Sequence, residues 1–320
     1  MNQQAPVSQH APVTGSGPGH ESVIRAERLA KSYGRRRGLD GLDLEVRAGE
    51  VFGYLGPNGA GKTTTIRLLL DLIRPSGGQV RVLGTRPRAG GPALRRRIGY
   101  LPGEFSIDGR QSVREALTYL GNLRGGIPAG RIEELAGRLD LELGARVRSL
   151  SKGNRQKVGL VQAFMHTPEL LVLDEPTSGL DPLVQQQFLV MVRQARQRGQ
   201  TVFMSSHVLS EVQHVADRVG VIRQGRLVAV EGVEALRERA LRRVEIRFAA
   251  PVAADDFARL PGVHDLAVDG TVLRCRLEGS PDGLLKAAAR HTVVDLLSEE
   301  PDLEELFLAY YHQREADRAA

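Results

Sequence analysis

The sequence predicts an α/β fold for most of the chain and a small α+β unit at its C-terminal end. Short apolar segments of strand length alternate with longer segments of helical periodicity between residues 23 and 238. Strands that are separated by helices pair in parallel, and the helices cover both faces of the resulting sheet. From residue 239 onward, apolar residues alternate along short segments, which is typical of antiparallel strands.

Five apolar segments predict the strands of the larger unit. They lie at residues 51–55, 98–101, 170–173, 201–204 and 219–222. Apolar residues at helical spacing predict the intervening helices at residues 63–73, 113–123, 131–139, 155–165 and 183–198. Pro75 would stop the first of these helices, because proline cannot continue the helical hydrogen bonds.

The C-terminal unit is expected to contain a hairpin, two helices and two further strands. Strands at 266–268 and 272–277 flank Asp269 and Gly270, a pair typical of a hairpin turn. The other strands are expected at 243–248 and 293–297, and the helices at 281–290 and 301–311. Residues 1–22 are rich in Pro, Gly, Gln and Ser and predict a disordered tail. The expected domains are therefore residues 23–238 and 239–320.

The composition excludes several classes of protein. The chain has 320 residues, of which 41% are hydrophobic, and this length suffices for two buried cores. Its single cysteine, Cys275, excludes an internal disulfide framework and a cysteine metal site. The longest apolar run, residues 306–311, is far shorter than the roughly 18 residues of a membrane-spanning helix. The N-terminal residues lack a secretory signal, so we expect the chain to stay in a reducing cytoplasm.

The net charge of +6 is unevenly distributed. Residues 241–320 carry 10 basic and 15 acidic side chains, or −5, so residues 1–240 carry +11. The excess is mostly arginine scattered over helical segments, with one local run at Arg35, Arg36 and Arg37. Two interpretations remain open at this stage, a solvated basic face and a surface for an anionic partner.

Residues 56–63 read GPNGAGKT, a full match to the phosphate-binding loop pattern G-x-x-x-x-G-K-[ST]. The loop follows an expected strand and opens an expected helix, so backbone N–H groups and the helix N-terminus would face a phosphate. Lys62 would contact the β and γ phosphates, and the Thr63 hydroxyl would bind Mg²⁺. We assign nucleotide binding to Gly56, Pro57, Asn58, Gly59, Ala60, Gly61, Lys62, Thr63 and Thr64.

The apolar strand at 170–173 ends in two carboxylates, Asp174 and Glu175. Beside the strand that carries the phosphate-binding loop, Asp174 would hold the hydration shell of Mg²⁺. Glu175 would polarise the water that attacks the γ-phosphate. Adjacent carboxylates also occur by chance at strand ends, and it is the phosphate-binding loop that favours the functional interpretation.

With these two elements, four others make the chain resemble the nucleotide-binding subunits of ABC transporters. Tyr33 stands in KSYG, residues 150–157 read LSKGNRQK, residues 176–182 read PTSGLDP, and residues 205–207 read SSH. All six elements occur in family order between Tyr33 and Asp217. The resemblance implies a P-loop NTPase fold with an ABC ATPase domain and a helical subdomain at about residues 104–165, with ATP and Mg²⁺ as cofactors.

The resemblance also implies roles for individual residues. Tyr33 would stack on adenine, and Ser151 and Gly153 would bind the γ-phosphate held by the opposite subunit of a dimer. His207 would hydrogen-bond the γ-phosphate, and Asp181 would lie in the nucleotide-binding loop. Alternatives remain open: Tyr33 as an ordinary half-buried aromatic residue, His207 as a satisfied imidazole, and Asp181 as a helix N-cap, alone or in addition. Catalysis is thereby assigned to Lys62, Glu175 and His207.

The chain departs from the family pattern at two places. The signature usually reads LSGGQ, whereas Lys152 and Asn154 replace a Gly and the Gln here, which brings a positive charge near the anion site. The family's Gln after the strand at 98–101 is replaced by Gly103 and Glu104. Glu104 retains the capacity to accept a hydrogen bond from a water near Mg²⁺.

The function implied is that of an ATPase subunit on the cytoplasmic face of the cell membrane. It would dimerise with a second copy or a paralogous ATPase on binding ATP, and drive separate transmembrane permease subunits. The segment from Ser112 to Leu123 would touch that permease. The C-terminal unit resembles the appendage of drug-exporter and related ABC-2 type ATPases, which indicates export.

Two alternatives belong to other functional classes. A soluble ABC ATPase acting on ribosomes or nucleic acid would carry two nucleotide domains, long coiled coils or a zinc module. This chain has one phosphate-binding loop and only 94 residues from Gly56 to Leu150, without heptads or cysteine pairs, so no specific nucleic acid is expected. A module that binds ATP without hydrolysing it is disfavoured by Glu175, because the loss of this carboxylate is the simplest route to such a protein.

Overall fold

The computed structural model describes residues 21–107, 109–239 and 241–299. Its central sheet has strands in the order β5 (Ile98–Leu101), β6 (Leu170–Asp174), β7 (Thr201–Ser206), β3 (Val51–Leu55), β8 (Arg218–Arg223) and β9 (Arg226–Gly232). The first five strands are parallel, and β9 is antiparallel to β8. Every residue of β3, β6 and β7 is buried, as a sheet covered on both faces requires. The α/β prediction is therefore confirmed.

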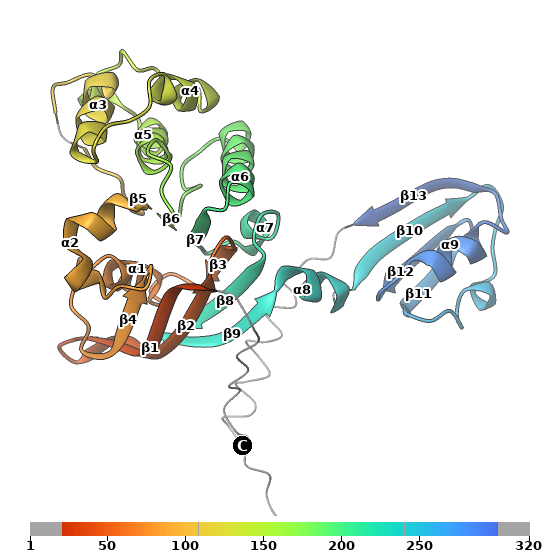
Figure 1. The fold of residues 1–320 in the computed structure, drawn as a ribbon. Coiled ribbons are helices and arrows are strands. Elements are labelled where there is room, and N and C mark those ends of the chain that lie inside the picture. Colours follow the sequence, from red (N-terminus) through yellow and green to blue (C-terminus); the bar gives the residue numbers. More distant parts are fainter. Residues whose placement is uncertain (1–20, 108, 240, 300–320) are drawn as a thin grey trace, which may run out of the picture.

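Helices connect these strands or follow them (Figure 1); all five helices predicted for the larger unit are present, and those at residues 87–96, 209–212 and 233–239 were not predicted. They are α1 (Lys62–Leu69), α2 (Pro87–Arg96), α3 (Val113–Leu123), α4 (Arg131–Arg138), α5 (Lys152–Phe164), α6 (Pro182–Gln197), α7 (Leu209–Val212) and α8 (Val233–Arg239), with a short 3₁₀ turn, η1, at Val147–Ser149. Helices α3 and α4 pack against α5, and α5 packs on β5. Helix α1 ends one turn before the predicted residue 73, because Asp71 adopts a left-handed backbone conformation with φ of 56°.

A second sheet, which the sequence analysis did not predict, is antiparallel. Its order is β2 (Arg36–Arg47), β1 (Ser22–Tyr33) and β4 (Gly77–Val82). The pairing of β1 with β2 shifts register at several places, so the apolar residues do not alternate regularly along either strand. This sheet and α1 form an apolar core with one face of the central sheet, and α3 to α6 form another core with the opposite face.

The C-terminal residues form a third sheet with a core of its own. Its order is β11 (Val263–Asp269), β12 (Val272–Leu277), β10 (Arg242–Phe248) and β13 (Val293–Glu299), accompanied by α9 (Asp282–Ala288) and a 3₁₀ turn, η2, at Ala254–Asp256. The predicted hairpin is present, with Gly270 and Thr271 rather than Asp269 and Gly270 in its turn. The helix expected at 301–311 and residues 1–20 of the expected tail lie outside the described residues.

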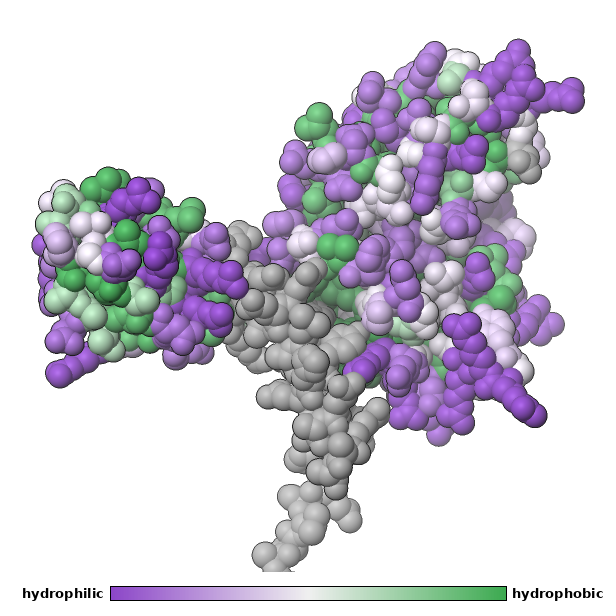
Figure 2. All heavy atoms as spheres, turned by 180° about the vertical axis from the view of Figure 1, so that it is seen from behind, coloured by the Kyte–Doolittle hydropathy of each residue, from purple (hydrophilic) through white to green (hydrophobic). Residues whose placement is uncertain are grey.

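Exposed apolar residues are concentrated on the C-terminal sheet. On the face shown in Figure 2 the larger unit is mostly hydrophilic, whereas the C-terminal unit shows more hydrophobic surface. Strand β13 contributes Val293, Val294, Leu296 and Leu297, which are 39–62% exposed. Within the described ranges, no helix combines the length and the apolar character needed to cross a membrane.

The turn between β8 and β9 links the phosphate-binding loop to β2 through backbone hydrogen bonds. The Gly225 N–H donates a hydrogen bond to the Ala60 carbonyl at 2.8 Å, and the Gly225 carbonyl accepts one from the Asp40 N–H at 2.9 Å. Gly225 has φ of +78°, and a Cβ atom there would lie 2.8 Å from Leu39 Cα. The loop and β2 therefore approach each other through a position that only glycine fits.

We predict that Gly225→Ala lowers the free energy of unfolding by about 2–3 kcal/mol, through backbone strain and the clash with β2. Gly199→Ala is the matched control, because Gly199 has φ of +81° but no heavy atom within 4 Å of the added Cβ. The control should lose only about 1 kcal/mol, the cost of the left-handed conformation. Urea unfolding of both variants measures the difference, and equal losses would contradict the importance of this contact.

Candidate nucleotide-binding site

The phosphate-binding loop connects β3 to α1, as predicted. Lys62 is 6% exposed, and its Nζ donates hydrogen bonds to the carbonyls of Gly56 at 2.5 Å and Pro57 at 3.4 Å. Gly61 caps α1 with φ of 117°, and a Cβ atom there would lie 2.8 Å from the Gly38 carbonyl oxygen. The loop thus folds around the ammonium group of Lys62, while residues 57–59 and Thr63 are exposed to solvent.

The two carboxylates at the end of β6 differ in their surroundings. Asp174 is 1% exposed, and its Oδ1 accepts a hydrogen bond from Ser205 Oγ at 2.6 Å. The Glu175 N–H donates to the same Ser205 Oγ at 3.0 Å. Asp174 Oδ2 is buried and has no hydrogen-bond partner among the described residues. Burial raises the pKa of nearby Tyr100 to about 12, and the negative charge of Asp174 adds to this rise.

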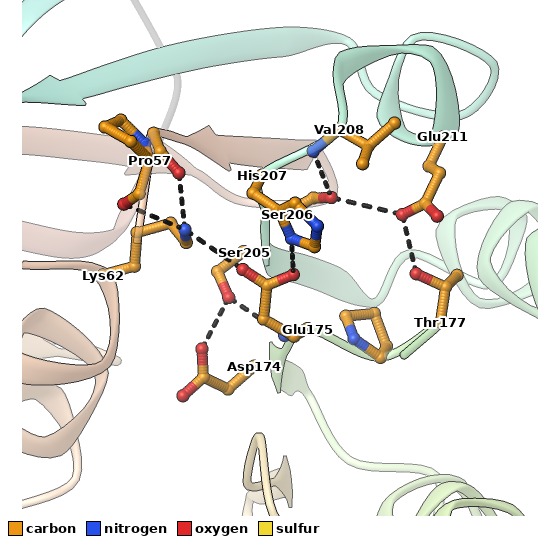
Figure 3. Close-up of polar contacts among 12 residues, drawn as sticks. Pro57, Lys62, Asp174, Glu175, Thr177, Ser205, Ser206, His207, Val208 and Glu211 are labelled. Atoms are coloured by element: carbon orange, nitrogen blue, oxygen red, sulfur yellow. Dashed lines mark hydrogen bonds and ion pairs between the residues drawn. The ribbon is translucent and has the colours of Figure 1, made fainter. Parts of the chain in front are cut away.

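Glu175 joins the loop to the end of β7 (Figure 3). Its Oε1 forms an ion pair with Lys62 Nζ at 3.1 Å, and its Oε2 lies 2.7 Å from His207 Nδ1. His207 is the most exposed of the three, with 52% of its side chain accessible, against 20% for Glu175 and 6% for Lys62. Glu175 has φ of 49°, which is unusual for a residue with a side chain. The arrangement brings all three expected catalytic residues into contact.

A second polar group supports the loop that carries His207. The Glu211 carboxylate accepts hydrogen bonds from Thr177 Oγ1 at 2.7 Å and from Ser206 Oγ at 3.2 Å. Ser206 Oγ in turn accepts from the Val208 N–H at 3.0 Å. Glu211 therefore links the segment after Glu175 to the segment around His207.

The signature residues lie at the start of α5. Ser151 is the N-cap of this helix, because its side chain accepts a hydrogen bond from the Asn154 N–H at 3.2 Å. Gly153 lies so close to Gly179 that a Cβ atom would be 2.7 Å from the Gly179 carbonyl oxygen. Among the described residues, no hydrogen bond or ion pair joins Ser151 or Gly153 to the group formed by Lys62, Glu175 and His207.

Three further positions were open in the sequence analysis. Tyr33 is 44% exposed at the end of β1, with Lys31 Nζ 5.2 Å from its ring centroid. Asp181 caps α6, because its Oδ1 accepts a hydrogen bond from the Val184 N–H at 3.0 Å, so the structural interpretation of Asp181 is confirmed. Gly103 lies beside Asp174, where a Cβ atom would be 3.4 Å from Oδ2.

The sequence analysis did not assign roles to Ser205 or Gln156. Ser205 bridges Asp174 and Glu175, and its pairing with Asp174 in the parallel register of β6 and β7 explains this position. Gln156 Nε2 donates to the carbonyls of Glu175 at 3.3 Å and Pro176 at 3.1 Å, which fastens α5 to the carboxylate segment. The available signal was the position of Ser205 near a strand end, two residues before His207.

Comparisons with known proteins identify the family to which the chain belongs. The family model for the ABC transporter matches residues 39–178. The bacitracin transport ATP-binding protein of Bacillus licheniformis is 36% identical over 221 residues, which are 68% of this chain and 72% of that protein. The linearmycin resistance ATP-binding protein of Bacillus subtilis (strain 168) is 30% identical over 302 residues, covering 89% of this chain and 97% of the relative.

The fold is similar to that of solved proteins as well. A structure described as the ATP binding subunit of an ABC transporter matches with a TM-score of 0.62 and 28% sequence identity. The match covers 67% of this chain and 92% of that chain. On the sequence motifs, the geometry of the site and these similarities, the chain belongs to the ABC transporter family as an ATP-binding subunit.

Proposed function

We propose that the chain powers an exporter by hydrolysing MgATP at the site formed by Lys62, Asp174, Glu175 and His207. The observation that carries this proposal is the contact of Glu175 with both Lys62 and His207 at the mouth of the phosphate-binding loop. Export, rather than import, is supported by the resemblance of the C-terminal unit to exporter ATPases and by the relative named for linearmycin resistance. The chain would act at the cytoplasmic face of the cell membrane.

The residues around Asp174 fit a magnesium ion. Asp174 Oδ2 is a buried carboxylate oxygen without a hydrogen-bond partner among the described residues, and oxygen is the ligand atom that Mg²⁺ prefers. The exposed hydroxyl group of Thr63, in the first turn of α1, is the second candidate ligand. A bound Mg²⁺ would neutralise part of the negative charge of the phosphate groups. Gly103, beside Asp174, has no side chain to contribute.

Glu175 is suited to act as the base that accepts a proton from the attacking water. Its carboxylate lies at the mouth of the loop, and the 2.7 Å contact with His207 Nδ1 orients it. The exposed His207 would place its other ring nitrogen toward the γ-phosphate. Lys62, now held by loop carbonyls and by Glu175, would bind the β and γ phosphates.

Ser151 and Gly153 are suited to a nucleotide held by another subunit. Both lie at the N-terminus of α5, where backbone N–H groups favour an anion, and neither is bonded to Lys62 of its own chain. We infer a head-to-tail dimer, with a second copy or a paralogue, in which ATP is bound between two chains. We also infer that residues 239–320 form an accessory domain, since their described part has its own sheet and core.

Helix α3 is the proposed contact with a transmembrane subunit. Ser112 caps it, and Glu115 completes a capping box, so the helix begins at a fixed point. Tyr119 and Leu123 are 59% and 62% exposed on the surface of α3. Large exposed apolar side chains on one helix suit an interface with another protein.

We predict that Glu175→Gln binds MgATP and dimerises, but hydrolyses ATP at least about 100-fold more slowly, because the proton acceptor is lost. Phosphate release measures turnover, and light scattering measures the dimer. Lys62→Ala should instead lose nucleotide binding itself, so the two variants separate catalysis from binding. Full turnover by Glu175→Gln would contradict the assignment of the base.

We predict that Ser205→Ala raises the Mg²⁺ concentration for half-maximal ATPase activity by about tenfold. The loss of the Ser205 hydroxyl would release the Asp174 carboxylate that it orients, and residues that orient a metal ligand affect affinity by about this amount. Ser210→Ala, which removes an exposed hydroxyl group from α7, is the control. An unchanged Mg²⁺ dependence in Ser205→Ala would contradict the role of Ser205 in orienting a metal ligand.

The transporter itself is tested by purification of tagged Glu175→Gln from native membranes in MgATP. We expect a protein with several membrane spans to co-purify, and we expect Tyr119→Asp combined with Leu123→Asp to abolish its recovery. Leu183→Asp on α6, where Leu183 is 77% exposed, is the matched control and should retain the partner. Recovery of ribosomes or DNA without a membrane protein would overturn the proposed function.

A further inference from the structure

The arginine run at 35–37 extends from the turn between β1 and β2 into the first residues of β2, near Tyr33. Arg36 is the residue paired with Tyr33 in the register of the two strands. The β2 strand is in turn connected to the phosphate-binding loop through Asp40, Gly225 and Ala60. The run therefore occupies a defined place beside the nucleotide site rather than a remote basic face.

The charges of the run have different partners. Arg37 Nη1 lies 3.0 Å from Asp40 Oδ2, which also pairs with Arg226 Nη2 at 2.6 Å. The hydrogen bond from Arg226 is the main reason that the pKa of Asp40 is lowered, with Arg37 contributing as well. Arg37 and Arg226 are thus neutralised in part by the carboxylate between them, and Arg37 is not available to a second anion without losing this contact.

Arg36 is placed differently. In the part of the chain that the structure describes, its guanidinium forms no hydrogen bond and no ion pair. Its Nη2 atom is only 3.9 Å from the position that a Cβ atom would take on Gly59. Gly59 lies at the exposed tip of the phosphate-binding loop, so this unpaired cation lies above the loop and on the same side as Tyr33.

We propose that Arg36 binds the phosphate chain of the nucleotide, as a second cation in addition to Lys62. This inference rests on the proposed function, because it requires that the nucleotide binds between Tyr33 and the loop. The planar guanidinium presents several N–H donors that match phosphate oxygens, and it is positively charged at every physiological pH. The ligand class is a nucleoside di- or triphosphate, and the position of Arg36 Nη2 beside Gly59 puts the guanidinium within reach of a phosphate held by the loop.

The experiment is a calorimetric titration of the full chain with MgADP and with the Mg complex of the β,γ-imido analogue of ATP. Arg36→Gln should weaken the binding of both nucleotides by about five- to tenfold, and the loss should shrink as salt is raised. Arg36→Lys keeps the charge without the planar donors and should recover part of the affinity. Arg35→Gln, the matched control at the preceding residue, should change affinity less than about twofold.

The outcomes separate this inference from the function on which it rests. Equal losses in Arg36→Gln and Arg35→Gln, or no loss in either, would overturn the role of Arg36 while leaving nucleotide binding intact. A wild-type chain that binds neither nucleotide would contradict both proposals. The urea midpoint of Arg36→Gln should equal that of the wild type, because the Arg36 side chain forms no hydrogen bond or ion pair in the described fold and the substitution keeps its backbone pairing with Tyr33. A lower midpoint would make its role structural.

Discussion

The parallel register of β6, β7 and β3 is the constraint on which the candidate site depends. Asp174 pairs with Ser205, and Leu55 pairs with Ser206, so the carboxyl ends of these strands meet at one edge of the sheet. The phosphate-binding loop, the carboxylate pair and His207 each follow one of these ends, which is where ligands bind in open α/β sheets. A slip of one residue in β6 would turn Asp174 to the opposite face and separate it from Ser205.

The helices and strands that could be predicted from the sequence are those whose pattern of apolar residues is complete within a short stretch of the chain. Buried parallel strands appear as continuous apolar runs, so residues 51–55 and 98–101 were delimited without error. Helix α3 was predicted at its observed bounds because its apolar face repeats at helical spacing after Ser112. The candidate site residues Lys62 and Glu175 were proposed for a similar reason, since each lies in a short pattern next to a strand, whereas His207 was proposed from the resemblance to the family.

The parts that were not predicted depend on distant contacts. The sheet of β1, β2 and β4 was missed because bulges break the alternation of its apolar residues. Ser205 could not be assigned, because its role arises only when β6 and β7 pair across 31 residues of sequence. The arginine run was ambiguous in part for the same reason: Arg37 shares the Asp40 carboxylate with Arg226, which is 186 residues away from Asp40.

The ion pair between Lys62 and Glu175 matters both for the stability of the loop and for the proposed chemistry. A buried ammonium group without a partner would destabilise the chain by several kcal/mol, and Lys62 avoids this cost through two carbonyl groups and the Glu175 carboxylate. Phosphate oxygens carry the same sign of charge as that carboxylate, so an arriving nucleotide would compete with Glu175 for Lys62. On the proposed function, the residue that neutralises Lys62 in the free chain would therefore be left beside the γ-phosphate when the nucleotide binds, which is where a base is needed.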